Sequence, residues 1–107
     1  MAENTIENPP GNPLQKIMDI DPEFGGLLEN TRELAMEKGG IPLKYRILIA
    51  MALDASKGAE NGVRVLAEQA MQEGATKEEL IEAIRIAQYV CGVGAVYTAA
   101  RAFDDLL

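Results

Sequence analysis

The chain contains no histidine and no tryptophan, and it has a single cysteine, Cys91. The absence of histidine removes the side chain most often used as a general base near neutral pH, and the commonest zinc ligand. A single cysteine cannot form a disulfide within the chain, so nothing indicates secretion. We therefore expect neither a metal nor another cofactor, because a transition-metal site would have to be built mainly from carboxylates and Cys91.

Basic residues are outnumbered, with 10 Lys and Arg against 17 Asp and Glu and a formal net charge of −7. Non-specific nucleic-acid binding needs clustered cationic side chains, and an anionic membrane surface repels an acidic protein. No apolar stretch approaches the roughly 20 residues that span a bilayer, and no basic segment precedes an apolar one at the N-terminus. We expect a cytoplasmic protein that binds neither nucleic acid nor membranes.

Large aromatic side chains are scarce, since Phe, Tyr and Trp together make up 5% of the residues. The core must therefore be filled by aliphatic residues, methionine and alanine. Small side chains let helices pack closely, but each buries little apolar surface, and a small domain of this kind is marginally stable alone. A chain of 107 residues suits a single domain, and we expect it to form a homo-oligomer.

Most of the sequence has the periodicity and the end signals of α-helices. Residues 1–12 combine proline, glycine and asparagine and are predicted to be a flexible N-terminal arm. Residues 13–107 are predicted to form one all-α domain of five or six helices, of which the first covers residues 13–20.

Three features locate further helices. Asp21-Pro22 is a typical helix start, with the aspartate as N-cap, and the helix that follows is expected to end near Lys38. Thr76 and Glu79 have the spacing of a capping box ahead of an apolar run. Ile47–Leu53 consists of seven consecutive apolar residues. A helix that is apolar all round is covered all round, either by its own bundle or by a partner subunit.

Two later segments have one apolar face each. Between residues 56 and 73 the apolar positions are Val63, Leu66, Ala67, Ala70 and Met71. After the predicted cap they are Leu80, Ile84 and Ala87. Two glycines then interrupt the last apolar run, where they disfavour helix by roughly 1 kcal/mol each. They are predicted to mark a break between two helices, at Gly92 and Gly94.

Four short motifs occur in a characteristic order, namely Pro22-Glu23-Phe24, Lys44-Tyr45-Arg46, Gly74-Ala75-Thr76 running on to Glu82-Ala83, and Gly92-x-Gly94-Ala95. Over about residues 22–103 the chain thereby resembles the carboxymuconolactone decarboxylase and alkylhydroperoxidase D family. The resemblance implies an alkylhydroperoxidase D-like helical domain that assembles as a trimer or hexamer.

The resemblance also shows what this chain lacks. Family members that reduce hydroperoxides carry a Cys-x-x-Cys pair, a histidine and a glutamate, so that one thiolate attacks the peroxide and the other resolves the sulfenic acid. These positions correspond to Ala59, Gly62, Leu66 and Ile47 here. None of the four residues has an acidic, basic or nucleophilic side chain. Decarboxylases of the family keep the same histidine, so the usual residues for both reactions are absent.

Three residues remain as candidates for a catalytic role, and each also has a structural interpretation. Cys91 is either a reactive thiol near a helix break or a small buried side chain. Glu60 is either part of an acid–base cluster or one member of a solvated face with Arg64 and Glu68. Arg46 is either a donor to a substrate carboxylate, with Lys44 beside it, or an anchor at the end of a buried helix.

Three functions follow from these observations. The first is thiol-dependent hydroperoxide reduction through Cys91, which is the antioxidant oxidoreductase activity that the resemblance implies. The second is a lyase or decarboxylase that acts on a small carboxylated lactone. The third is a non-catalytic oligomeric binding protein, which the residue chemistry favours. The expected ligand is accordingly a small hydroperoxide or a carboxylate, and whether the chain is an enzyme at all stays open.

Overall fold

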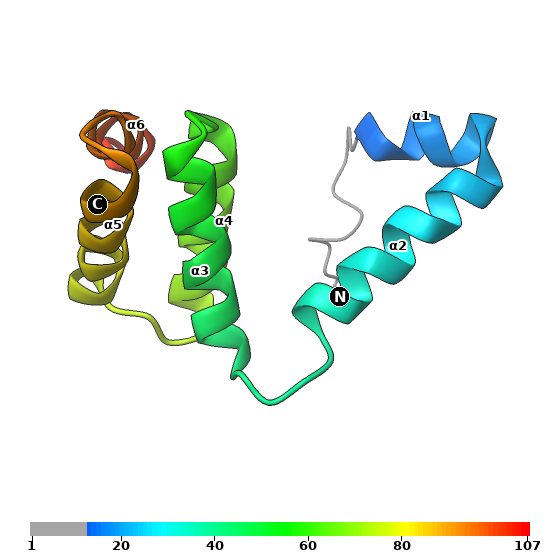
Figure 1. The fold of residues 1–107 in the computed structure, drawn as a ribbon, viewed down its shortest axis with the longest axis horizontal. Coiled ribbons are helices and arrows are strands. Elements are labelled where there is room, and N and C mark those ends of the chain that lie inside the picture. Colours follow the sequence, from blue (N-terminus) through cyan, green and yellow to red (C-terminus); the bar gives the residue numbers. More distant parts are fainter. Residues whose placement is uncertain (1–12) are drawn as a thin grey trace. The chain divides into compact units, whose positions relative to one another are not determined.

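The computed structural model describes residues 13–107, so the N-terminal arm predicted for residues 1–12 lies outside the described residues. The described part is all-α, as predicted, with six helices and no strand (Figure 1). The chain divides into two compact units, Met1–Gly39 and Gly40–Leu107. A single domain over residues 13–107 stays a prediction. None of the six helices combines the length and the apolar character that crossing a bilayer demands.

The described part of the first unit is a pair of helices, α1 (Pro13–Ile20) and α2 (Pro22–Met36). As predicted, Asp21 caps α2, and its side chain accepts a hydrogen bond from the backbone N–H of Phe24 at 3.1 Å. The two helices meet closely at Gly25, where an added Cβ would lie 2.9 Å from Cα of Met18. The start of α2 therefore follows from a local signal in the sequence.

The end of α2 differs from the prediction by two residues, because the helix ends at Met36 rather than near Lys38. Arg32 forms salt bridges with Glu29 at 2.6 Å and with Glu37 at 2.8 Å. Both carboxylates raise the pKa of Arg32, with the hydrogen bond to Glu29 as the largest cause. The pairing with Glu37 places a charged contact at the residue that caps the helix.

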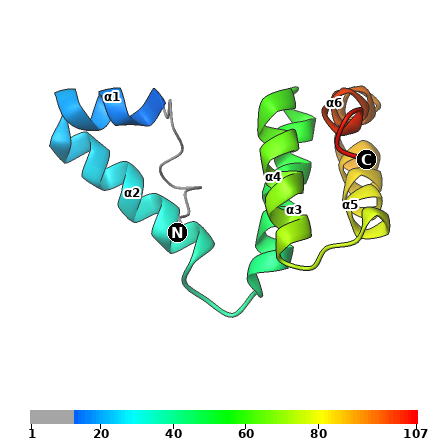
Figure 2. The same ribbon diagram turned by 180° about the vertical axis from the view of Figure 1, so that it is seen from behind.

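The second unit is a four-helix bundle of α3 (Leu43–Ser56), α4 (Glu60–Gln72), α5 (Lys77–Cys91) and α6 (Gly94–Phe103). The helix α3 contacts each of the other three. Figures 1 and 2 show α3, α4 and α5 running upright beside one another, while α6 is seen nearly end-on and so crosses them near one end. The core of the unit lies where these helices face each other.

The core consists of aliphatic residues and alanines, as predicted. Met51, Leu80 and Val63 are the largest fully buried side chains. The predicted apolar face of α5 is confirmed, because its buried residues are Leu80, Ile84 and Ala87. On α4 the buried residues of the predicted apolar face are Val63, Ala67 and Ala70. The other two residues of that face, Leu66 and Met71, are half-buried.

The remaining helix ends have local causes. Thr76 and Glu79 form the predicted capping box at the start of α5. Gly92, with φ of +103°, separates α5 from α6, which confirms the predicted break. The segment between residues 56 and 73, which was predicted as one helical pattern, is instead divided between α3 and α4. Ser56 belongs to α3, since its hydroxyl donates to the carbonyl of Ala52 at 3.0 Å, and α4 begins only after Gly58, whose φ is +78°.

Candidate functional site

A groove runs between α3 and α5 because small side chains occupy the positions where the two helices face each other. Alanines contribute from both helices, namely Ala52, Ala83 and Ala87. Alanine fills little of the 8–10 Å that separates the axes of packed helices, so space remains between the two helices. The capping box fixes where α5 begins, and Pro42 precedes the first residue of α3. Local signals therefore position both walls.

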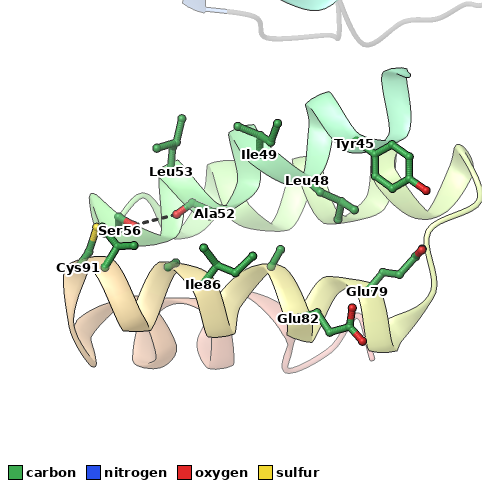
Figure 3. Close-up of a pocket in the computed structure, with 13 residues that line it drawn as sticks. Tyr45, Leu48, Ile49, Ala52, Leu53, Ser56, Glu79, Glu82, Ile86 and Cys91 are labelled. Atoms are coloured by element: carbon green, nitrogen blue, oxygen red, sulfur yellow. Dashed lines mark hydrogen bonds between the residues drawn. The ribbon is translucent and has the colours of Figure 1, made fainter. Parts of the chain in front are cut away.

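The α3–α5 groove has a volume of about 430 Å³ and is partly open to solvent, and Figure 3 shows the side chains that line it. Its lining is mainly aliphatic. The lining residues from α3 are Tyr45, Leu48, Ile49, Ala52, Leu53 and Ser56. Those from α5 are Glu79, Glu82, Ala83, Ile86, Ala87, Val90 and Cys91. All of them belong to the second unit.

One end of the groove is polar and acidic. Glu79 lies there with the ring of Tyr45 opposite (Figure 3). The Glu79 carboxylate accepts the backbone N–H of Thr76 at 3.0 Å and pairs with Nζ of Lys44 at 3.3 Å. These two interactions, the Thr76 hydrogen bond first, lower the pKa of Glu79. Glu82 adds a second, exposed carboxylate to the lining.

Cys91 and Ser56 lie together at the opposite end of the groove (Figure 3). Cys91 is the last residue of α5 and its thiol is exposed. Cys91 is therefore not the small buried side chain of its structural interpretation. The Ser56 hydroxyl donates its proton to the Ala52 carbonyl. This end thus presents one accessible thiol beside a hydroxyl that is already engaged.

The other two candidate residues lie away from the groove. Arg46 is buried, and its Nε donates to the carbonyl of Ile41 at 2.7 Å, which secures the loop before α3. Glu60, at the start of α4, accepts from Nε of Arg101 on α6 at 2.9 Å. Neither residue lines the groove. Of Cys91, Glu60 and Arg46, the structure brings only Cys91 into it.

Charged residues of α4 form salt bridges with residues near the C-terminus, and so do more than pair along their own helix. Beside the Glu60–Arg101 pair, Arg64 pairs with Asp105. The hydrogen bond from Arg64 lowers the pKa of Asp105, and the same bond raises the pKa of Arg64. The interpretation of Glu60 and Arg64 as members of a simple solvated face is thus incomplete.

The four positions at which the resemblance places the family's catalytic residues hold apolar side chains or glycine. Ile47 is buried in the core, and Ala59 precedes α4 as its N-cap residue. A Cβ added at Gly62 would collide with the Asp54 carboxylate, whose Cγ would lie 2.9 Å away. Leu66 is half-buried on α4. None of these four positions lines the α3–α5 groove.

Tyr45, Ser56, Glu79 and Glu82 line the groove and were not predicted as site residues. A signal for the groove does exist in the sequence, because apolar residues recur four apart on both helices, at Ile49 and Leu53 and at Ile86 and Val90. Which face of each helix is left open depends on packing. Within residues 13–107, no three His, Cys, Asp or Glu side chains lie together as a metal site would require.

The sequence profile of the carboxymuconolactone decarboxylase family matches residues 22–105. That match spans all of α2 to α6, including both walls of the groove. The chain belongs to the carboxymuconolactone decarboxylase family. The resemblance inferred from the four motifs, and the all-α fold that it implies, are thereby confirmed.

Among curated proteins, an uncharacterised protein of Cupriavidus necator is 30% identical to this chain over an alignment of 104 residues, which covers 86% of this chain and 92% of that protein. No solved structure matches the chain. Membership of the carboxymuconolactone decarboxylase family establishes the fold, whereas the activity has to be argued from the site.

Proposed function

We propose that this carboxymuconolactone decarboxylase family member is a non-catalytic binding protein that takes a small, mainly apolar molecule into the α3–α5 groove. The observation that carries the proposal is the groove itself. Its volume of about 430 Å³ falls within the range of roughly 300–1,000 Å³ that is common for small-molecule sites. Each square ångström of apolar ligand surface removed from water contributes about 25 cal/mol, so aliphatic walls favour an apolar guest.

The chemistry of the lining supports binding rather than turnover. Glu79 is held by the Thr76 N–H and by Lys44, and the Ser56 hydroxyl by the Ala52 carbonyl. A hydroxyl nucleophile is commonly activated by a general base within hydrogen-bond reach, and Glu79 lies at the far end of the groove from Ser56 and Cys91 (Figure 3).

The charge of the lining also bears on the ligand class. Its two ionisable carboxylates come from Glu79 and Glu82, and like charges brought together oppose binding. An uncharged guest is therefore favoured over a carboxylate. The lyase alternative draws no support from the groove, because the predicted carboxylate-binding Arg46 is directed to the Ile41 carbonyl.

The test is a fluorescence titration with N-phenyl-1-naphthylamine, a neutral apolar probe. Ala83 lines the groove on α5 and is half-buried, so Ala83→Phe should fill the space. We expect saturable binding to the wild-type protein and at least tenfold weaker binding to Ala83→Phe, which corresponds to about 1.4 kcal/mol. Val65 is exposed on α4 outside the groove, and Val65→Phe should bind as the wild type does.

Two results would contradict the proposal. One is the absence of saturable binding to the folded wild-type protein. The other is equal affinity of the wild type and Ala83→Phe, because the probe would then bind elsewhere on the surface.

A second candidate function, thiol-dependent hydroperoxide reduction, is supported by the exposed thiol of Cys91 at the end of the groove. The Cys91 thiolate would attack the terminal oxygen of an organic hydroperoxide, forming an S–O bond while the O–O bond breaks and the alcohol leaves with a proton. A low-molecular-weight thiol would then displace water from the sulfenic acid and form a mixed disulfide. A second such thiol would release Cys91 and leave as the oxidised disulfide.

A further inference from the structure

We propose that the α3–α5 groove binds a single-chain aliphatic amine, with the ammonium group at the acidic end of the groove and the alkyl chain along its aliphatic walls. The inference rests on the proposed function, because it names the chemical class of the guest that the same groove would hold. The acidic end is formed by Glu79 and Glu82 on α5 and by Tyr45 on α3. The guest is thus assigned a positive charge at one end and no charge elsewhere.

An ammonium group already binds at the acidic end, and it belongs to the chain itself. Nζ of Lys44 lies 3.3 Å from Oε2 of Glu79 and 4.9 Å from the centroid of the Tyr45 ring. The hydrogen bond to Glu79 is the largest of the causes that raise the pKa of Lys44, so this end stabilises a protonated amine. A carboxylate and the face of an aromatic ring are both favourable partners for an ammonium ion.

The second carboxylate of the acidic end has no such partner. The salt bridges within the described part of the chain involve other carboxylates and leave Glu82 without one. Glu82 is exposed, and it also lines a polar depression with Lys77 and Arg85, neither of which forms a salt bridge with it in the structure described. Because Glu79 and Glu82 are three residues apart, they are neighbours on one face of α5. Lys44 neutralises the first of these carboxylates, and the ammonium group of a guest would neutralise the second.

The rest of the groove suits an unbranched alkyl chain. Figure 3 shows the lining side chains following α3 and α5 along their length, from Glu79 at one end to Cys91 at the other. Glu82 and Cys91 are nine residues apart, so this stretch of helix is about 13 Å long, close to an extended chain of roughly ten carbon atoms. The lining residues of α5 between these two positions are uncharged, namely Ala83, Ile86, Ala87 and Val90.

The charge of the lining discriminates between amphipathic guests of equal length. A primary aliphatic amine is protonated near neutral pH, because its pKa is close to that of the lysine side chain, about 10.4. Such an amine is attracted to Glu82, whereas a fatty acid brings another negative charge toward that carboxylate and is repelled. An alcohol of the same length has neither effect. Because the three compounds share one apolar chain, their affinities isolate the contribution of the charged head group.

The experiment is isothermal titration calorimetry of the full-length protein with decylamine, 1-decanol and decanoate near neutral pH, below the concentrations at which they form micelles. We expect decylamine to bind about fivefold more tightly than 1-decanol, as the strongest solvent-exposed ion pairs allow, and decanoate to bind most weakly. Sodium chloride at about 1 M should remove most of the advantage of decylamine, because salt screens exposed charges.

Two charge-matched variants locate the head group. Glu82→Gln should bring the ratio of the decylamine and 1-decanol affinities to about one, whatever it does to both affinities together. Glu68 is exposed on α4 outside the groove, so Glu68→Gln changes the net charge equally and should leave the ratio as it is in the wild type. Ala83→Phe should weaken the binding of decylamine, as it weakens that of N-phenyl-1-naphthylamine, because the alkyl chain needs the same space.

The outcomes separate this inference from the proposed function. Equal affinities of decylamine and 1-decanol, or a preference for decylamine that Glu82→Gln leaves intact, overturn the inference while the proposed function stands. A preference that Glu68→Gln abolishes as fully as Glu82→Gln also overturns it, because net charge would then be the cause. If decylamine does not bind but N-phenyl-1-naphthylamine does, the inference alone is wrong. If neither compound binds the folded protein, both the inference and the proposed function are wrong.

Discussion

At the scale of single residues, Cys91 decides whether the groove could support chemistry as well as binding. It is the last residue of α5, it is exposed, and Ser56 lies beside it. Glu79 is at the opposite end and is held by Lys44 and the Thr76 N–H. The chain has no second cysteine, and a thiol without a resolving cysteine is poorly equipped for peroxide turnover.

The proposed binding function predicts that Cys91→Ser leaves hydroperoxide consumption unchanged. The wild type and the variant should consume cumene hydroperoxide at the same rate as the dithiol reductant alone, because binding rather than reduction is the proposed activity. The rate of hydroperoxide loss, followed with and without each protein, is the measurement. A wild-type rate clearly above that background and lost in Cys91→Ser would instead establish the peroxidase function.

Residue-scale features were predictable from the sequence when they depended on near neighbours. The capping box of Thr76 and Glu79 required only a four-residue pattern. The pairing of Glu60 with Arg101 joins residues 41 positions apart, and no local pattern encodes it. The same limit explains Arg46, whose partner is set by the path of the loop before α3.

At the scale of elements, helix starts were predicted more accurately than helix ends. Starts at Pro13 and after Asp21 and Thr76 have sequence signals that act over one turn. The boundary after α3 was missed because Ser56 bonds back into the helix, and the break falls instead at Gly58. The face of α3 that stays open could not be predicted, because it depends on where α5 packs.

The contact between α1 and α2 gives a second prediction from two adjacent glycines. A Cβ at Gly25 would lie 2.9 Å from the backbone Cα of Met18, whereas a Cβ at Gly26 would meet nothing within 4 Å. Gly25→Ala should therefore separate α1 from α2 and lower the hydrogen-exchange protection of α1. Gly26→Ala should raise the protection of α2, because alanine stabilises a helix interior by up to about 1 kcal/mol relative to glycine. Equal protection of α1 in the two variants would contradict this account of the contact.

At the scale of the whole molecule, membership of the carboxymuconolactone decarboxylase family and the helical fold were both predictable, since four motifs in order carried the resemblance. The groove was not, because alanines leave a space only once α3 and α5 lie against each other. The positions at which the resemblance places the family's catalytic residues, by contrast, include the buried Ile47 and the closely packed Gly62. We therefore propose that this chain binds its ligand on a different face of α3, the one that lines the groove.

The most direct test of that claim is a titration of ¹⁵N-labelled protein with N-phenyl-1-naphthylamine, followed by amide NMR shifts. We predict that the amides that move belong to the facing turns of α3 and α5, around Ala52, Ala83 and Cys91. Shifts centred on Ala59, Gly62 and Leu66 would instead place the ligand at the family's usual catalytic positions and contradict the account.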